Sequence, residues 1–290
     1  MATPPHSRSF DGIGTSWIVS TGEPLSDSRF AELLGIVEEY DRTYSRFRAD
    51  SVVTRLATTA GPAPFPPDAG ELFGLYEKLY RLTAGGVTPL VGASLERLGY
   101  DAAYSLRASG DAVASPAWDD TLVLDRGTVT LRRPALLDVG AAGKGQLVDL
   151  LAERLKTWGY EERTVDGSGD LRHSGGASLR IALEHPFDPT RAIGVVELAD
   201  GALCASSIGR RAWGNGFHHV LDGRTGVPVD TVAATWVLAE TALLADGLAT
   251  ALFLADPDEL ATEFAFRYVV LHTDGRVRFS ADLPGEVFTA

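Results

Sequence analysis

The sequence predicts a mixed α+β protein, because helical and strand patterns follow one another without the regular strand–helix–strand alternation of a doubly wound sheet. Apolar residues recur at helical spacing in some segments, whereas others alternate or form short apolar runs typical of strands. No linker long enough to separate independent domains interrupts the 290 residues. We therefore expect mixed sheets with packed helices in one unit over residues 1–290, either a single large domain or two closely packed lobes, with residues 1–11 as a flexible arm.

The individual elements follow from local patterns. Helical spacing of apolar residues marks four segments: 28–44, 71–84, 92–98 and 240–254. Strand patterns mark five: 12–20, 163–165, 179–184, 194–198 and 233–237. Hairpins are expected in 121–131, turning at 125–127, and in 268–279, turning at 273–275. A proline-rich loop covers 61–67, and a further helix follows a glycine-rich turn and ends at Gly159.

The net charge, the cysteine count and the lack of long apolar runs argue against several classes of partner and site. A net charge of -13 argues against nucleic acid or an anionic membrane surface as the main partner, because phosphate backbones are bound by basic surface. Cys204 is the single cysteine, which excludes an intramolecular disulfide and a thiolate metal cluster. Residues 1–10 have no apolar run like that of a signal peptide, and no segment has the length of a membrane span. We therefore expect a cytoplasmic protein without membrane insertion, unless a leader was removed.

The most informative motif is the glycine-rich turn 138–145, which runs directly into a helical pattern. It carries one carboxylate, Asp138, and one ammonium, Lys144, at a helix N-terminus, where free N–H groups attract anions. Lysine is rare in this arginine-rich chain, and a compact ammonium suits a tight turn. The turn predicts a phosphate site, with an ordinary loop and helix cap as the alternative. Its spacing is not that of a Walker P-loop.

Asp246 stands in an otherwise apolar helical segment, with Thr250 one turn further along on the same side. A buried lone carboxylate is costly and needs a partner. A carboxylate and a hydroxyl on one helical face are hard oxygen ligands suited to Mg²⁺. The alternative is a helix-end contact for Asp246 and a hydroxyl of Thr250 that bonds back to its own helix.

Three further clusters gather polar groups in turns. Residues 218–226 combine two histidines with carboxylate, guanidinium and hydroxyl groups, which suits the edge of a ligand site, although paired histidines are more often structural. Residues 165–171 form a small-residue turn where a backbone could approach a flat ligand, or an ordinary tight turn. Residues 206–211 offer hydroxyls and two guanidiniums, or simply a solvated basic turn.

Together these segments resemble the ApbE family, the FAD:protein FMN transferases, and they occur in the family's order. The turn 138–145 resembles the family's Asp-x-Gly-x-x-x-Lys-Gly segment, and 166–170 its Gly-Gly-Asp turn. Residues 219–226 resemble His-x-x-Asp-Pro-x-Thr-Gly, and 245–250 resemble Ala-Asp-x-x-Thr. The resemblance extends from Gly14 and Thr15 through 44–51 to Thr250, nearly the whole chain.

The resemblance implies Mg²⁺-dependent cleavage of the FAD diphosphate, transfer of FMN to a threonine hydroxyl of an acceptor protein, and release of AMP. It implies that Asp246, Thr250 and the carbonyl of Ala141 hold Mg²⁺, that Asp246 is catalytic, and that His219 is either the proton acceptor or only a binding group. The FAD site that it implies consists of Gly14, Thr15, Phe47, Leu98, Gly99, Tyr100, Asp138, Lys144, Ser207, His219 and Val220.

Three positions depart from the family pattern. Gly223 replaces the usual proline, Ile208 stands where a glycine usually ends a Thr-Ser-Gly motif, and Thr88 occupies the place of a frequent aspartate. Two other functions remain open from the sequence: an FAD pyrophosphatase that releases free FMN and AMP, and a non-catalytic FAD-binding protein.

Overall fold

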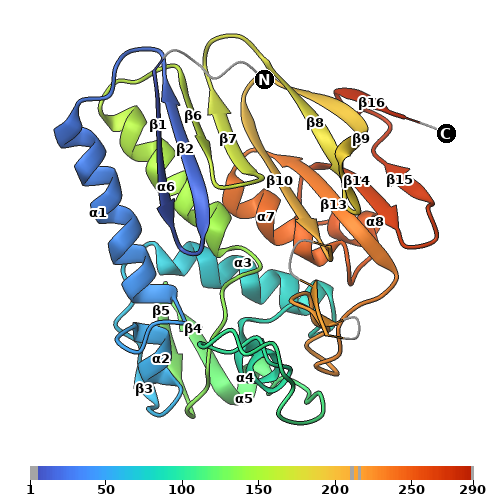
Figure 1. Cartoon of the computed structure of the whole chain (residues 1–290). Coiled ribbons are helices and arrows are strands. Elements are labelled where there is room, and N and C mark those ends of the chain that lie inside the picture. Colours follow the sequence, from blue (N-terminus) through green and yellow to red (C-terminus); the bar gives the residue numbers. More distant parts are fainter. Residues whose placement is uncertain (1–5, 210–211, 215–216, 289–290) are drawn as a thin grey trace.

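The computed structural model describes residues 6–209, 212–214 and 217–288. Its central feature is an antiparallel sheet of eight strands in the order β1-β2-β6-β7-β10-β13-β14-β15 (Figure 1). The strands are β1 (Ser7–Gly12), β2 (Thr15–Thr21), β6 (Arg163–Asp166), β7 (Asp170–Ser174), β10 (Gly201–Ser207), β13 (Val232–Ala239), β14 (Arg267–His272) and β15 (Val277–Phe279). The α+β prediction is confirmed.

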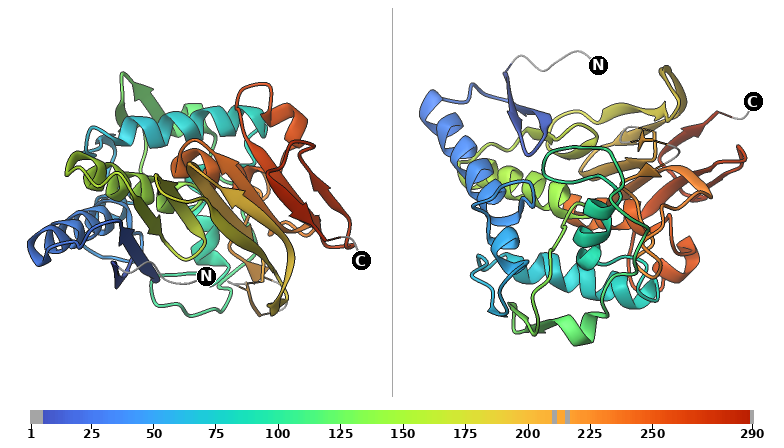
Figure 2. Two further views of the ribbon diagram at one scale, coloured as in Figure 1. Left: turned by 90° about the horizontal axis from the view of Figure 1, so that it is seen from above. Right: turned by 60° about the horizontal axis from the view of Figure 1, so that its bottom comes forward.

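Helices cover one face of this sheet and a small second sheet covers the other. Helix α6 (Gly143–Thr157) packs on β6 and β7, and α7 (Ala242–Ala251) packs on β10 and β13. Outside them lie α1 (Asp27–Tyr44) against α6 and α3 (Ala69–Leu82) against α7, as the view from above shows (Figure 2). Side chains of β10 and β13 alternate between the two apolar clusters that result. The second sheet has the order β16 (Gly285–Val287), β9 (Asp188–Leu198) and β8 (Leu179–His185).

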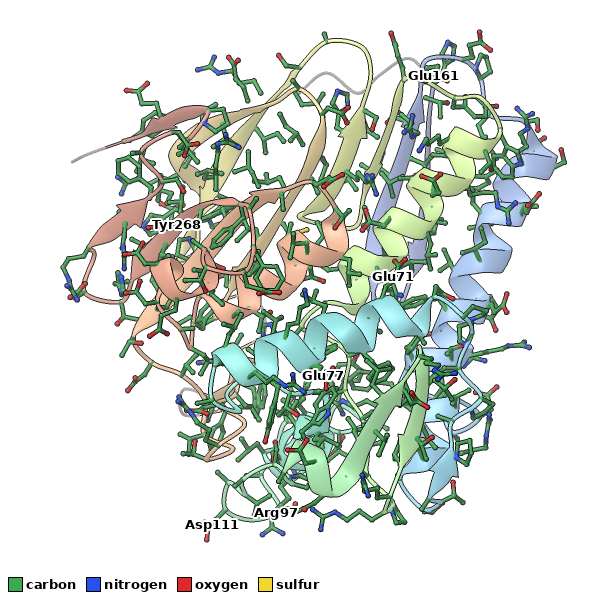
Figure 3. All side chains as sticks on the ribbon, turned by 180° about the vertical axis from the view of Figure 1, so that it is seen from behind. Glu71, Glu77, Arg97, Asp111, Glu161 and Tyr268 are labelled. Carbon is green, nitrogen blue, oxygen red and sulfur yellow. The ribbon has the colours of Figure 1, made fainter. Side chains whose placement is uncertain are left out.

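On the side of α3 that faces away from the main sheet, segments before and after α3 in the sequence form a smaller lobe (Figure 3). Glu71 and Glu77 mark α3, which separates this lobe from the main sheet (Figure 3). At its far end Arg97 lies beside Asp111, and the Arg97 Nε donates to the Asp111 carbonyl oxygen at 3.0 Å, which anchors the loop after α4. The lobe contains α2 (Val52–Leu56), η1 (Pro89–Val91), α4 (Gly92–Arg97), α5 (Trp118–Thr121) and the sheet β3 (Gly61–Pro62), β5 (Thr128–Leu131) and β4 (Leu122–Asp125).

The remaining elements are the short pair β11 (Ala212–Trp213) and β12 (Phe217–His218) and the helix α8 (Pro257–Leu260). Within the residues that the structure describes, no helix is both long and apolar enough to span a membrane.

Side-chain hydroxyl groups explain where helices α1 and α7 begin. The Ser26 hydroxyl accepts from the Arg29 N–H at the start of α1, and the Thr241 hydroxyl accepts from the Leu244 N–H at the start of α7. A side-chain oxygen at this position satisfies a backbone donor that has no partner within the helix. The helix predicted over 240–254 is therefore present, but it is confined to the ten residues of α7.

Two expectations at the N-terminus are wrong. Residues 7–11 are not an arm, because they belong to β1, which pairs with β2 from Ser7 opposite Ser20 to Gly12 opposite Thr15. The strand predicted over 12–20 begins only at Thr15. Ile13 and Gly14 have positive φ angles of 42° and 78° and form the hairpin turn, which alternation of apolar residues does not reveal.

Helices α6 and α7 cap each other's N-termini. The Asp246 carboxylate of α7 accepts from the Gly145 N–H of α6 at 2.9 Å. In return the Asp149 carboxylate of α6 accepts from the N–H groups of Ala242 and Leu243 at 3.0 and 2.8 Å. Each carboxylate thus lies at the positive end of the other helix's dipole. The two helix starts are held together by this exchange.

Close approach of the two helices requires glycine at position 145. A Cβ atom there would overlap the carbonyl oxygen of Ala242 and would lie 2.7 Å from the Cβ of Asp246. The obstacle is backbone, which cannot rotate away as a side chain can. We therefore expect Gly145→Ala to lower the free energy of unfolding by about 3 kcal/mol, the upper range for overpacking, in urea titrations followed by circular dichroism.

Gly35→Ala is the matched control, because Gly35 lies in α1 with no atom within 4 Å of an added Cβ. This change should raise stability by about 0.5 kcal/mol, since alanine favours a helix. Equal effects of the two substitutions would contradict the proposed junction.

Candidate functional site

A cavity of about 750 Å³ opens where the start of α6 and the second half of α7 meet the smaller lobe. Nearly every site residue expected from the sequence lines it: Gly14, Thr15, Phe47, Tyr100, Asp138, Ala141, Lys144, Ser207, His219, Val220, Asp246 and Thr250. They come from the β1–β2 turn, the segments after α1 and α4, the glycine turn and start of α6, the end of β10, the segment after β12 and the second half of α7. The volume lies within the range of small-ligand sites.

Asp138 shapes the glycine turn that enters α6. One of its carboxylate oxygens accepts from the Gly140 N–H at 2.8 Å, and the other accepts from the Arg46 Nε at 2.5 Å. The Asp138 N–H donates to the Pro89 carbonyl at 2.8 Å, which ties the turn to η1. Asp138 is therefore already engaged by the protein, and its first role is to hold the turn and Arg46 in place.

The three residues expected to hold a metal come together. The Thr250 hydroxyl donates to the Ala141 carbonyl oxygen at 3.3 Å, and Asp246 lies one turn earlier on α7. Thr250 thus contacts another segment instead of bonding back to its own helix. The Asp246 carboxylate is buried, 6% exposed, and the Gly145 N–H gives it the helix-end contact that the sequence left open. The Gly145 N–H is therefore one partner of this buried carboxylate.

The donor set at this point is chemically suited to a hard cation. It offers a carboxylate, a hydroxyl and a backbone carbonyl, all oxygen donors of the kind that Mg²⁺ takes while it keeps water or phosphate on its other positions. No group of three or more His, Cys, Asp or Glu side chains with metal-binding geometry occurs among the described residues. A soft or tightly caged metal is not indicated there.

Lys144 forms a buried ion pair. Its Nζ lies 2.8 Å from a carboxylate oxygen of Asp170, a side chain with no exposed surface at the start of β7. The sequence places Lys144 at a phosphate site, and the structure adds that its charge also compensates Asp170. Asp170 belongs to the small-residue turn noted in the sequence, but no spacing rule links it to Lys144.

The two adjacent histidines have different surroundings. His218 is 5% exposed; its Nε2 is 2.7 Å from the Val229 carbonyl, and its Nδ1 accepts from the Val220 N–H. Burial lowers the pKa of His218 below its usual range, which favours the neutral ring. His219 is half-buried and lines the cavity. Of the pair, His218 is structural and His219 faces the site.

Aromatic rings form another wall of the cavity. Phe47 stacks on Tyr104 with ring centroids 4.9 Å apart and planes at 10°, and Tyr100 stacks on Trp213 at 5.4 Å and 18°. The sequence does not predict Tyr104 or Trp213 as site residues, because Tyr104 lies outside any helix or strand and Trp213 lies in the two-residue strand β11, too short to have a recognisable pattern. Such rings suit a flat, apolar part of a ligand.

Leu98 and Gly99 do not line the cavity. The Leu98 carbonyl accepts from the Trp213 Nε1 at 2.8 Å, and Gly99 has a φ of +96°, with an added Cβ meeting the backbone of Arg107. Leu98 therefore supports the aromatic wall through Trp213, and Gly99 allows the backbone of Arg107 to approach.

Two departures from the family pattern contact each other. A Cβ atom on Gly223 would lie 2.6 Å from the Thr88 methyl carbon and 2.6 Å from the Gly85 carbonyl oxygen, and the Gly223 N–H donates to the Gly86 carbonyl at 2.8 Å. Thr88 also caps η1 by accepting from the Leu90 N–H. Threonine at 88 and glycine at 223 thus fit together. The third departure, Ile208, packs against the main apolar cluster, and residues 210–211 of the expected basic turn lie outside the described residues.

Comparisons with known proteins identify the family and the fold. The model of the ApbE family matches residues 13–268. An FAD:protein FMN transferase of Vibrio cholerae is 28% identical over 253 residues, covering 79% of this chain and 75% of that protein. One of Rhodobacter capsulatus is 29% identical over 294 residues, covering 93% of this chain but only 56% of its own length. The crystal structure of the ApbE protein of Thermotoga maritima superimposes with a TM-score of 0.82 at 22% identity, covering 95% and 97% of the two chains.

Lys144→Met should destabilise the protein because it leaves the buried Asp170 without its cation. Breaking a buried pair costs about 3–5 kcal/mol, and removing both charges costs much less. We therefore expect Lys144→Met/Asp170→Asn to recover most of the lost unfolding free energy in urea titrations. Lys144→Met as stable as the unmodified protein would contradict a stabilising role for the pair.

Gly223→Pro should destabilise the protein although proline is the usual family residue. The ring would overlap Thr88 and Gly85, and the hydrogen bond to Gly86 would be lost, a combined cost of about 2 kcal/mol or more. Thr88→Ser/Gly223→Pro should recover part of it, because serine keeps the capping hydroxyl without the methyl. The unfolding temperatures of both variants measure these effects. A double variant no more stable than Gly223→Pro would argue against the contact between Thr88 and position 223.

Proposed function

This chain belongs to the ApbE family and is an FAD:protein FMN transferase, and we propose that it uses Mg²⁺ to transfer the FMN half of FAD to a threonine hydroxyl of an acceptor protein. The family match over most of the chain supports the transferase assignment. The use of Mg²⁺ and of a threonine acceptor goes beyond this assignment and is our proposal.

The contact between Ala141 and Thr250 carries the proposal. A carbonyl oxygen of the glycine turn and a hydroxyl of α7 lie 3.3 Å apart, one helical turn from the Asp246 carboxylate, in the cavity that also contains Lys144. The three oxygens fit Mg²⁺, which when bound there would neutralise charge on the diphosphate and favour its cleavage. Lys144 adds a positive charge on the same side.

The transfer step then needs an acceptor hydroxyl and a group that takes its proton. The threonine oxygen attacks the phosphorus on the riboflavin side of the diphosphate, the bond from that phosphorus to the bridging oxygen breaks, and AMP leaves with the electron pair. His219 faces the cavity and is the candidate proton acceptor. His218 is not suited to this role, because both of its ring nitrogens are engaged by the backbone.

The protein and FAD, with and without Mg²⁺, can be incubated with a bead-bound library of synthetic peptides that carry threonine at a central position and random flanks. A matched library with central alanine is the control. The proposal expects AMP in solution together with peptides heavier by the mass of FMN, only from the threonine library and only with Mg²⁺. AMP and free FMN in equal amounts without peptide labelling would indicate a pyrophosphatase, and bound but intact FAD would indicate a binding protein.

Asp246→Asn should abolish Mg²⁺-dependent AMP release and leave the fold intact. The amide oxygen can still accept from the Gly145 N–H, so the junction of α6 and α7 is kept, whereas a neutral amide binds Mg²⁺ far less well than a carboxylate. Thr250→Val should cause a milder loss, because water can replace one neutral ligand. The measurement is AMP release against Mg²⁺ concentration, with circular dichroism as the fold control. A folded Asp246→Asn protein with unchanged activity and Mg²⁺ requirement would exclude this metal site.

A further inference from the structure

Arg46 is a buried cation in the wall of the cavity that the proposed reaction does not use. It follows the end of α1, is 4% exposed, and its Nε donates to Asp138 at 2.5 Å. Its neighbour Asp138 lies in the glycine turn, so Arg46 links α1 to the entrance of α6. This ion pair explains why the charge is tolerated there, but it engages only one of the three guanidinium nitrogens.

The other two nitrogens, Nη1 and Nη2, are buried and have no hydrogen-bond acceptor among the described residues. Instead the guanidinium lies against two aromatic rings, 4.2 Å from the centroid of Phe47 and 5.0 Å from that of Tyr100. Contact with ring faces offsets part of the cost of burying a cation. Buried N–H donors without an acceptor still cost free energy, and each such group in a native protein needs an explanation.

The surroundings indicate what kind of acceptor would complete this arrangement. Phe47, Tyr100, Tyr104 and Trp213 form a ring-lined wall, and Tyr104 is 51% exposed where it stacks on Phe47. A flat ring system can stack among such side chains. Asp138 already neutralises the charge of Arg46, so the remaining feature is a planar fork of donors, which suits ring nitrogens or carbonyl oxygens at the edge of a heterocycle.

We propose that Arg46 binds the acceptor-bearing edge of one planar ring of FAD, through Nη1 and Nη2, while that ring stacks in the aromatic wall. This binding requires Phe47, which is half-buried at the cavity surface with its ring centroid 4.2 Å from the guanidinium, to turn aside. The inference rests on the proposed function, because it takes FAD as the ligand. Adenine and isoalloxazine both carry acceptor atoms at a ring edge, and the experiment distinguishes them.

The test uses two substitutions of Arg46 and one control. Arg46→Lys keeps a charge for Asp138 but removes the fork, and Arg46→Met removes both. Arg42→Met is the matched control, because Arg42 lies four residues away, 63% exposed, with its Nε bonded to Glu38 at 2.8 Å, and it does not line the cavity. Calorimetric titration with FAD, FMN and AMP measures affinity for the whole ligand and for each half, and thermal unfolding checks the fold.

We expect Arg46→Lys and Arg46→Met to weaken FAD binding about tenfold or more, the usual effect of leaving a buried polar contact unmade. The same factor should appear for only one of FMN and AMP, and that half-ligand carries the ring that Arg46 binds. Arg42→Met should bind all three ligands within about twofold of the unmodified protein.

Three results would overturn the inference. Folded Arg46→Lys and Arg46→Met proteins with unchanged FAD affinity would show that the fork contacts no ligand, while the proposed function would stand. Equal losses of affinity for FMN and AMP would show that Arg46 only supports the cavity wall and binds neither ring. An unmodified protein that binds none of the three ligands would overturn the proposed function and this inference together.

Discussion

The mutual capping of α6 and α7 is the constraint on which the rest of the site depends. Asp246 accepts from the start of α6, Asp149 accepts from the start of α7, and Gly145 lets the two helix ends approach. Asp149 also pairs with Arg172 of β7, at 2.6 Å, so the sheet is tied to the same junction. Burial raises the pKa of Asp149 despite this cation. A ligand site formed there has walls that cannot move independently.

This junction also explains the pairing of charges around the cavity. Asp138, Asp149 and Asp170 each lie against a cation: Arg46, Arg172 and Lys144 respectively. Asp246 is held by a backbone N–H of the helix that begins with the glycine turn. Because the carbonyl of Ala141 and the hydroxyl of Thr250 lie beside each other, the α6–α7 junction gathers hard oxygen atoms where we propose that Mg²⁺ neutralises the charge of the diphosphate.

Much of this site could be predicted because several of its segments contain residues that are unusual for the helix or turn in which they lie. Glycine at 145, the small residues of 166–170 and the lone Asp246 in an apolar helix are each unusual in their local context, and their order along the chain is distinctive. The aromatic wall could not be predicted, since Tyr104 lies outside any helix or strand and Trp213 lies in the two-residue strand β11. The positions of such short segments depend on tertiary contacts such as the Trp213 bond to Leu98. Nor could the pairing of Lys144 with Asp170 or of Arg46 with Asp138, because residues distant in the sequence meet only in the folded chain. The β1–β2 turn was missed because alternation continues across Ile13 and Gly14.

The central claim is that the α6–α7 junction holds a divalent cation against the diphosphate of FAD. The most direct measurement replaces Mg²⁺ by paramagnetic Mn²⁺ and records the ³¹P resonances of FAD bound to the protein. The account predicts strong broadening of both phosphorus signals in the unmodified protein and its loss in Asp246→Asn, with FAD still bound at high concentration. Sharp ³¹P signals for bound FAD in the presence of Mn²⁺, or broadening that survives the removal of the Asp246 charge, would contradict it.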